Sequence, residues 1–216
     1  MPLIESASYN DCLSLLRASA ALSCSIIREP VQAKVVARWA SEVPPTAADT
    51  PPPYSDAIEA VELASHLEIL GVIKRASYEL LASEAFWTDA RSGNIAPTSL
   101  LSHKLGRFYH ARAMLQQAWR AHVLTLPQNG DRTCLRSCAC SDPSTMHTGV
   151  ATWCATFAQD MVEEVRDPLR AIDGMSMRVR ALKDTAIWCE SCIDERADAW
   201  EKERTAWWTG LDEWLL

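Results

Sequence analysis

The amino-acid sequence predicts an all-α protein, a single irregular domain of about seven to nine helices with one proline-rich loop. Two features of the sequence lead to this prediction. Glycine is scarce, with 7 residues in 216, whereas residues that lose little side-chain freedom in a helix, such as alanine, leucine, arginine and glutamate, are abundant. Apolar residues recur at helical spacing along most of the chain, and no convincing segment alternates with the period of a strand.

Residues 9–42 are predicted to form an N-terminal pair of helices. In the first, apolar residues recur at helical spacing behind Asn10 or Asp11, either of which can cap a helix start. The second is expected to begin at Pro30, because proline is well tolerated in the first helical turn. The apolar side of this second helix consists of Val31, Val35, Val36 and Trp39.

Residues 43–54 separate this pair from the main helical body, which we assign to residues 55–216. A cluster of prolines excludes a helix here and favours an extended surface loop: Pro44, Pro45, Pro51, Pro52 and Pro53. The alternative, a ligand for an aromatic-lined groove, requires a P-x-x-P frame that this segment lacks.

The first part of the main body is predicted to hold two helices and a loop. Asp56 and Glu59 have the spacing of a capping box ahead of an apolar helix. Gly71 is expected to separate this helix from the next one. Residues 88–97, with Gly93-Asn94 and a proline, are predicted to form a loop.

The clearest helix of the chain follows that loop, and Thr98 or Ser99 can cap its start. Its apolar stripe follows the helical period: Leu101, Leu105, Phe108, Leu115, Trp119 and Val123. Residues 126–147 are predicted to form a second loop, and Thr148 to begin the next helix. Asp167-Pro168 is expected to end that helix and start another, after which the apolar pattern continues into the C-terminal tail.

The charge distribution argues against binding of nucleic acid. The formal net charge is −7, and residues 184–216 hold nine acidic and three basic residues, or −6 of that total. Binding of DNA or RNA depends on lysine and arginine side chains that neutralise phosphates. Because the chain offers no basic stripe, we expect no nucleic-acid partner.

Signals for secretion or for a membrane are also missing from the sequence. The first residues lack the basic and apolar regions of a signal peptide. No run of about 18 apolar residues is present, so we expect no membrane span. The eight cysteines are therefore interpreted as reduced intracellular thiols, which places the protein in the cytoplasm or the nucleus.

Several short motifs occur in a recognisable order along the chain. They are Leu15-Leu16-Arg17-Ala18-Ser19, Val35-Val36-Ala37-Arg38-Trp39, Val43-Pro44, the helix from Asp56 to Ala64, the segment from Ile73 to Leu80, Leu105-Gly106-Arg107, and the ending Leu182…Cys189-x-x-Cys192…Arg204…Trp208-x-x-Leu211. This order resembles the helical region that follows the BTB domain in BTB/POZ domain-containing proteins of basidiomycete fungi. The resemblance implies a role in protein interaction and no chemistry.

The chain departs from that pattern in three respects. We expect the BTB domain itself to be absent, because few residues precede the first predicted helix. Asp212 stands after Leu211, where the family has proline. The final aromatic residue of the family is replaced by Leu215 or Trp214.

The cysteines suggest a structural zinc site. Four thiolates from Cys134, Cys138, Cys189 and Cys192 would surround the ion and link the loop at 126–147 to the C-terminal helix, with Cys140 or His147 as substitutes. The alternative is that Cys154, Cys189 and Cys192 are small core residues, as we expect for Cys12 and Cys24. A thioredoxin-like redox role for C-x-x-C lacks the βαβ context of that motif.

No catalytic pattern is present. The five histidines are scattered without an H-E-x-x-H arrangement, and neither a G-x-S-x-G elbow nor a glycine-rich phosphate loop occurs. The carboxylates of Asp194, Glu195 and Asp198 share a helix with Arg196, Lys202 and Arg204, a pattern typical of an exposed, charge-paired helix rather than an acid–base pair.

The tail also holds Trp200, Trp207, Trp208 and Trp214, which we expect to pack in the core, with an interface as the alternative. The sequence as a whole favours a non-enzymatic protein-interaction or adaptor-type module with an unidentified protein partner. Two alternatives are a stand-alone regulator stabilised by structural zinc and, more remotely, an uncharacterised helical enzyme.

Overall fold

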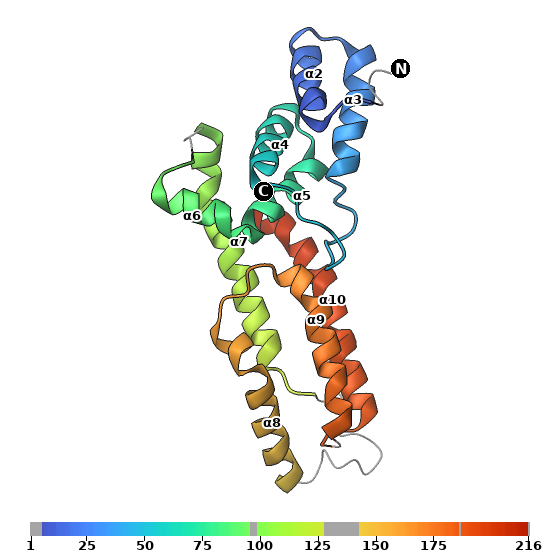
Figure 1. Ribbon diagram of the computed structural model, residues 1–216, viewed down its shortest axis with the longest axis vertical. Coiled ribbons are helices and arrows are strands. Elements are labelled where there is room, and N and C mark those ends of the chain that lie inside the picture. Colours follow the sequence, from blue (N-terminus) through green and yellow to red (C-terminus); the bar gives the residue numbers. More distant parts are fainter. Residues whose placement is uncertain (1–5, 96–98, 128–142, 186, 216) are drawn as a thin grey trace. The chain divides into compact units, whose positions relative to one another are not determined.

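The structure, a computed structural model, describes residues 6–95, 99–127, 143–185 and 187–215; the side chains of residues 99–103 and 143–146 are not described. Within these ranges the protein is all-α, as predicted, with nine α-helices, one 3₁₀ helix and no strand (Figure 1). The helices are α2 (Tyr9–Ala21), α3 (Ser25–Arg38), α4 (Tyr54–Leu67), α5 (Leu70–Ala82), α6 (Glu84–Ser92), α7 (Ser99–Leu124), α8 (Pro143–Val162), α9 (Pro168–Ala181), the 3₁₀ helix η2 (Leu182–Thr185) and α10 (Glu190–Leu215).

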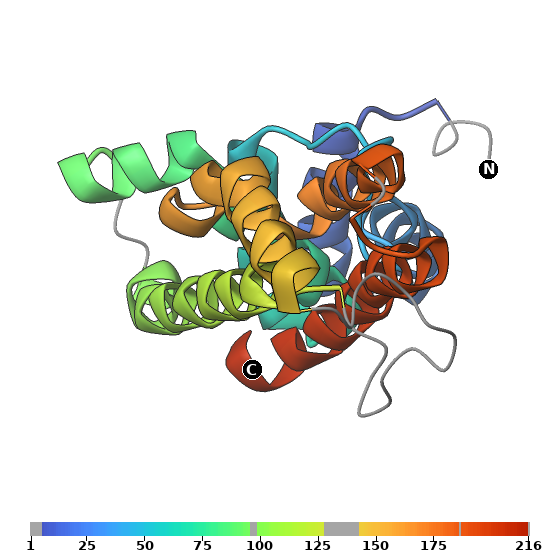
Figure 2. The same cartoon turned by 90° about the horizontal axis from the view of Figure 1, so that it is seen from below.

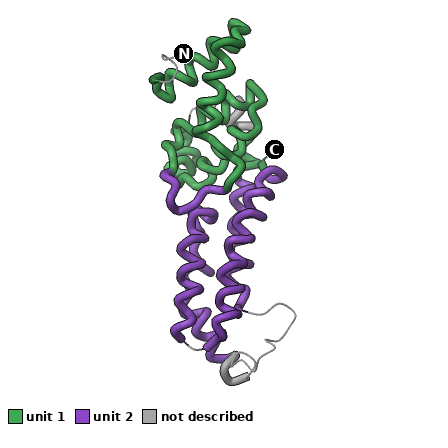
Figure 3. The backbone as a smooth tube through the Cα atoms, turned by 90° about the vertical axis from the view of Figure 1, so that its right-hand side faces the viewer, with its two compact units in different colours: residues 1–43, 51–108, 215 green, residues 44–50, 109–214, 216 purple. Residues whose placement is uncertain are grey.

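The chain forms two compact units (Figure 3). Unit 1 comprises residues 1–43, 51–108 and 215, and unit 2 comprises residues 44–50, 109–214 and 216. The predicted N-terminal pair, 9–42, therefore lies in unit 1, whereas residues 44–50 of the predicted proline-rich loop belong to unit 2. No helix in the described ranges provides an apolar stretch of the length that crossing a membrane requires.

In unit 1, α2 packs on α3 and α4 packs on α5. The cap of α2 is Ser8 rather than Asn10 or Asp11. The Ser8 hydroxyl accepts a hydrogen bond from the Asp11 backbone N–H, and the Asp11 carboxylate accepts one from the Ser8 N–H. Asp11 thus serves as the acidic partner of a capping box, three residues after the Ser8 cap.

The prediction that the second helix begins at Pro30 is wrong, because α3 begins at Ser25. A tight turn ends α2, with Ser23 in the left-handed region at φ 52° and the Cys24 N–H bonded to the Ser19 carbonyl. The Cys24 carbonyl then accepts from the Arg28 N–H and opens α3. Pro30 lies inside the helix, where its missing N–H removes one backbone bond.

The break predicted at Gly71 lies three residues earlier. Glu68 adopts the left-handed conformation at φ 57° and ends α4, and α5 starts at Leu70, so Gly71 lies in a helical turn. Glycine serves a different purpose there. A Cβ atom at residue 71 would lie 3.1 Å from the Ser41 Oγ atom, so the missing side chain allows a close approach.

The prediction of a loop over 88–97 is wrong for its first half, because α6 extends to Ser92. The Ser83 hydroxyl caps α6 by accepting from the Phe86 N–H at 3.2 Å, and Gly93 ends it at φ 73°. Phe86 and Trp87 are buried, and the Trp87 indole donates to the Leu81 carbonyl at 2.9 Å. Buried aromatic packing thus holds this short helix in unit 1.

Unit 2 contains the C-terminal part of α7 together with α8, α9 and α10. Five positions of the predicted stripe of the long helix are described: Leu105 is half-buried, and Phe108, Leu115, Trp119 and Val123 are buried. The helix predicted from Thr148 begins five residues earlier, at Pro143, since proline suits a first helical turn. Asp167 caps α9 as predicted, accepting from the Arg170 N–H at 3.2 Å.

Helices α9 and α10 lie side by side in both views of the protein (Figures 1 and 2). The Ser176 hydroxyl of α9 donates to the Ala197 carbonyl of α10 at 3.3 Å. The Trp119 and Trp200 rings join α7 to α10, with centroids 5.0 Å apart. The Trp153 indole of α8 donates to the Val123 carbonyl at 2.7 Å, which attaches α8 to the end of α7.

Candidate functional site

The C-x-x-C pair lies at the start of α10. The Cys189 carbonyl accepts from the Ile193 N–H, so Cys189 is the N-cap residue of this helix. Its Sγ atom accepts from the Cys192 N–H at 3.4 Å and lies 3.2 Å from the Cys192 Sγ atom. Cys189 is half-buried, whereas Cys192 is only 2% exposed. The structure therefore brings the two predicted thiols together.

The other half of the predicted zinc site, Cys134 and Cys138, lies outside the described residues, as does Cys140. His147, the remaining substitute, lies in α8 and is exposed. Among the described residues, no group of three or more potential metal ligands gathers at one point. The described part of the chain thus contains one pair of the predicted four ligands, and the four-thiolate site stays a prediction.

The cysteines that were expected in the core divide into two kinds. Cys12 and Cys192 are buried, as expected. Cys24 is half-buried, and Cys154 is exposed on α8, contrary to the expectation of a core position. Cys154 directly follows the buried Trp153, and the buried side of α8, with Trp153 and Phe157, does not extend to it.

The tryptophans of the tail pack in the core, as expected. Trp200, Trp207 and Trp208 are buried, and Trp214 is half-buried. Trp200 and Trp207 both contact the Trp119 ring of α7. The interface alternative is therefore wrong for the three buried side chains.

A buried cluster that was not predicted joins Arg196 of α10 to His122 of α7. Arg196 is 4% exposed, and its Nη1 atom lies 2.8 Å from the His122 Nε2 atom, while Nη2 donates to the His122 carbonyl. The guanidinium carbon lies 5.3 Å from the Trp200 ring centroid and 5.9 Å from that of Trp153. The faces of these rings provide electron density that partly replaces the water lost by the buried cation.

This cluster fixes the protonation of both side chains. Burial, together with the charge of Arg196, lowers the pKa of His122 from its ordinary 6.5 to about 3. Burial also lowers the pKa of Arg196, to about 10. At neutral pH the arginine is therefore charged and the histidine neutral, so the His122 Nε2 atom accepts from Arg196 and is not available as a base.

A second buried arginine, Arg204, holds part of the proline-rich segment. It is 7% exposed and donates to the Asp173 carboxylate of α9, which also accepts from the Ala47 N–H at 2.7 Å. Burial by itself would raise the pKa of Asp173, but the bonds from Ala47 and Arg204 hold it below its usual value. Asp173 thus ties residues 44–50 to α9 within unit 2.

The prediction that Arg196 and Arg204 lie on an exposed, charge-paired helix surface is wrong. The remaining charges do form pairs at the surface, but mostly with partners on the preceding elements: Lys183 with Asp194 at 2.7 Å, and Arg180 with Asp198 at 2.8 Å. The burial of the two arginines could have been predicted from their spacing. They lie on the same side of the helix as Ile193, Trp200, Trp207 and Leu211.

One surface of unit 2 is unusually apolar. The solvent-facing side of α8 also exposes His147, Thr148 and Gln159, and it includes six apolar side chains at helical spacing: Val150, Ala151, Cys154, Ala155, Ala158 and Val162. Val162 is 78% exposed. No charged residue occurs between Pro143 and Gln159 in a chain in which 23% of residues are charged. We call these six side chains the α8 face.

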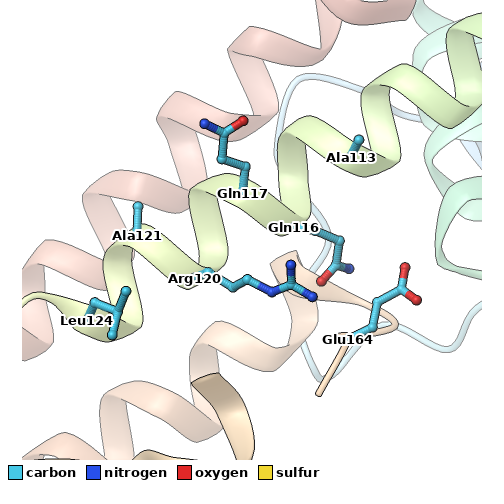
Figure 4. A pocket seen from close by; sticks show the side chains of 7 residues that line it. All are labelled: Ala113, Gln116, Gln117, Arg120, Ala121, Leu124 and Glu164. Atoms are coloured by element: carbon cyan, nitrogen blue, oxygen red, sulfur yellow. The ribbon is translucent and has the colours of Figure 1, made fainter. Parts of the chain in front are cut away.

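A shallow hollow of about 610 Å³ lies along α7 in the same unit (Figure 4). Apolar groups line part of it, and the most exposed of these is Leu124, at 62%. Arg120 and Gln116 point towards Glu164, which follows α8 (Figure 4). The full lining is Ala113, Gln116, Gln117, Arg120, Ala121, Leu124 and Glu164.

Comparisons with known proteins give no relative for this chain, since no protein-family model, no curated protein and no solved structure matches it.

Proposed function

We propose that this chain is a non-enzymatic helical module that binds a protein partner, and that the α8 face is its contact surface. The observation behind this proposal is the run of six exposed apolar side chains without a charge among them. Single exposed apolar residues are common on any protein, but a contiguous group of them is typical of an interaction surface.

The composition of the α8 face suits contact with another helix. Alanine and cysteine side chains at positions 151, 154, 155 and 158 are short, so a partner backbone can approach α8 closely. Val150 and Val162 stand at the two ends and provide larger apolar contacts. An amphipathic helix that lays its apolar side on such a face would bury both surfaces.

The hollow on α7 adds a place for a polar contact. Arg120 and Gln117 provide hydrogen-bond donors beside the apolar Leu124 side chain, whereas the Gln116 side chain is bonded to the Val165 backbone. A mixture of one apolar contact and several polar groups is typical of the rim of an interface.

The resemblance to the helical region of fungal BTB proteins supports the same function, as does the lack of a catalytic motif in the sequence. The pKa of His122 is lowered to about 3, and its side chain is bonded to Arg196. The proposal therefore includes no reaction. It places the protein inside the cell, in the cytoplasm or the nucleus, with a protein rather than a nucleic acid or a membrane as partner.

The proposal can be tested by site-specific crosslinking. A photoreactive residue at Ala155, in the middle of the α8 face, is compared with the same residue at Ala85, which is exposed at the start of α6. Irradiation in native cells should give discrete adducts from position 155 and none of these from position 85. Ala155→Glu should abolish capture of the crosslinked protein, whereas Ala85→Glu should leave it unchanged. Identical adducts from both positions would contradict the proposal.

The structure also offers one observation in favour of a second function, a regulator stabilised by structural zinc. Two thiols 3.2 Å apart at the start of a helix can provide half of a tetrahedral site. Metal analysis of the purified full chain tests this function. Stoichiometric zinc that is lost in Cys189→Ser and Cys192→Ser, together with unfolding, would support it. Absence of metal with unchanged stability would exclude it.

A further inference from the structure

The geometry of Cys189 and Cys192 has a consequence that is independent of partner binding. Their Sγ atoms are 3.2 Å apart. A disulfide bond requires an S–S distance of about 2.0 Å, so the sulfur atoms need to move by only about 1 Å to form one. Small rotations of the two side chains are enough for such a movement, and α10 can keep its position.

The two thiols differ in ways that suit a stepwise oxidation. Cys189 is half-buried and accessible, whereas Cys192 is buried behind it. The Cys189 Sγ atom lies at the N-cap of a 26-residue helix and accepts the Cys192 N–H. Because of the difference in burial, an external disulfide can reach the Cys189 sulfur atom before it reaches the buried Cys192 sulfur atom.

We propose that Cys189 and Cys192 form a modification site that takes a low-molecular-weight disulfide, of which glutathione disulfide is the type, and is converted into an intramolecular disulfide. The Cys189 thiolate attacks one sulfur of glutathione disulfide. The S–S bond of the reagent breaks, a mixed disulfide forms at Cys189, and the first glutathione leaves as a thiolate.

The Cys192 thiolate then attacks the Cys189 Sγ atom and displaces the second glutathione. The two protons of the cysteines end on the two glutathione thiols. The pair is thereby oxidised by two electrons, and one glutathione disulfide is reduced to two glutathiones. In this reaction the protein is the substrate of thiol–disulfide exchange, and no βαβ framework is needed.

The fluorescence of Trp188 provides a way to follow the reaction. Trp188, directly before Cys189, is buried and its ring lies 6.1 Å from that of Trp153 of α8. It also lies so close to Gly149 that a Cβ atom there would be 3.1 Å from the Trp188 ring. Formation of a disulfide at the next residue should therefore change the fluorescence of Trp188, and Trp188→Phe should remove that change.

The test uses the full chain, made metal-free with a chelator and incubated in mixtures of reduced and oxidised glutathione. Samples are quenched with acid and alkylated, and the peptides are mapped by mass spectrometry. We expect a disulfide between Cys189 and Cys192 to form at oxidised-glutathione concentrations about tenfold lower than those that modify the exposed Cys154, because the second step is intramolecular. Alkylation of Cys189 and Cys192 as complete as that of Cys154, or a disulfide from either to another cysteine, would overturn the proposal.

Two variants separate the roles of the sulfur atoms. Cys192→Ser should stop the reaction at a glutathione adduct on Cys189, and Cys154→Ser, the matched control, should leave closure of the pair unchanged. A glutathione adduct that persists on Cys189 in the unsubstituted chain would also contradict the proposal. Circular dichroism shows whether each variant is folded. If a variant is not folded, peptide mapping of the unsubstituted chain alone decides whether the Cys189–Cys192 disulfide forms.

Discussion

Two arginines, Arg196 and Arg204, are buried in unit 2 together with their partners. A buried charge is costly unless its donors are satisfied. Arg196 meets this need with the ring and the carbonyl of His122 and with the faces of two tryptophans. Arg204 meets it with the carboxylates of Asp173 and Glu201. In both arginines the buried Nε atom has no hydrogen-bond partner among the described residues, so the need is met only in part. At the Arg196 site we expect stability to depend on protonation of His122, and at the Arg204 site on the presence of Asp173.

His122 makes stability depend on pH. Its pKa is about 3 in the folded protein and about 6.5 when unfolded, so below pH 6.5 the unfolded chain binds a proton that the folded protein does not. Stability is therefore complete above pH 6.5 and falls as the pH decreases towards 3. Since the ring is partly exposed, we expect a loss on the order of 1 kcal/mol at pH 5. Urea unfolding at pH 7, 6 and 5 measures it.

The control for this prediction is the exposed His147. His122→Gln should flatten the dependence of the unfolding free energy on pH between 6.5 and 5, because glutamine can still accept from Arg196. His147→Gln should leave the dependence as it is. Equal slopes for all three proteins would show that another group is responsible.

Asp173 and Asp198 provide a matched pair of ion pairs to arginine. Asp173 pairs with the buried Arg204, whereas Asp198 pairs with Arg180 at an exposed position. Asp173→Ala should lower the free energy of unfolding by about 2 kcal/mol, since it removes the acceptor of the Ala47 N–H and leaves the buried Arg204 with only the more exposed Glu201, at 3.4 Å. Asp198→Ala should cost about 0.5 kcal/mol or less. Chemical denaturation compares the two, and equal losses would show that the burial of Arg204 is unimportant.

At the scale of helices, left-handed residues decide where elements end. Glu68 ends α4 at φ 57°, and Gly93 ends α6 at φ 73° with open space around its Cα atom. Glu68→Gly should stabilise the protein by about 0.5–1 kcal/mol, because glycine adopts this conformation without steric cost. Gly93→Ala should destabilise it by about 1 kcal/mol for the opposite reason. Thermal unfolding measures both changes, and a loss of stability in Glu68→Gly would contradict the argument.

The long helices could be predicted from the sequence, because their buried stripes repeat over several turns. The stripe with Phe108, Leu115, Trp119 and Val123 is an example. Helix α6 was missed although its signals are local: Ser83 caps it and Gly93 ends it. The turn at Glu68 could not be predicted from local preference, because glutamate in the left-handed region is held there by the packing of α4 on α5.

The candidate site was predicted only where its residues are close in sequence. Cys189 and Cys192 are three residues apart, and their thiols are in contact as the spacing suggests. Arg196 and His122 are separated by 74 residues, and a single histidine between Ala121 and Val123 gives no sign of a distant arginine. The apolar side of α10 contained the missing information, since both buried arginines occupy positions that its period assigns to the core.

At the scale of the whole molecule, charge is the property that limits the range of partners. The acidic tail of residues 184–216 is partly neutralised by cations of the preceding elements, such as Lys183 and Arg180. The net charge is −7, and the sequence has no basic stripe that would balance it. The α8 face, with no charge of either sign, therefore depends on apolar contact and should bind its partner with little dependence on salt.

This charge balance predicts no affinity for nucleic acid. The full chain should not retard a double-stranded DNA fragment in an electrophoretic assay at about 50 mM salt, because too few cations are available to displace counterions from the phosphates. Retardation at 50 mM salt that disappears at about 200 mM would contradict this expectation.

The bond between Asp173 and the Ala47 N–H joins residues that are 126 positions apart. During synthesis, residues 44–50 leave the ribosome long before α9 and α10 exist, so this part of unit 2 must wait while residues 51–108 of unit 1 are made. Contacts of such long range form late and slow the folding of a chain. Unit 1 can therefore begin to fold on the ribosome, whereas unit 2 is completed only after synthesis has passed Arg204.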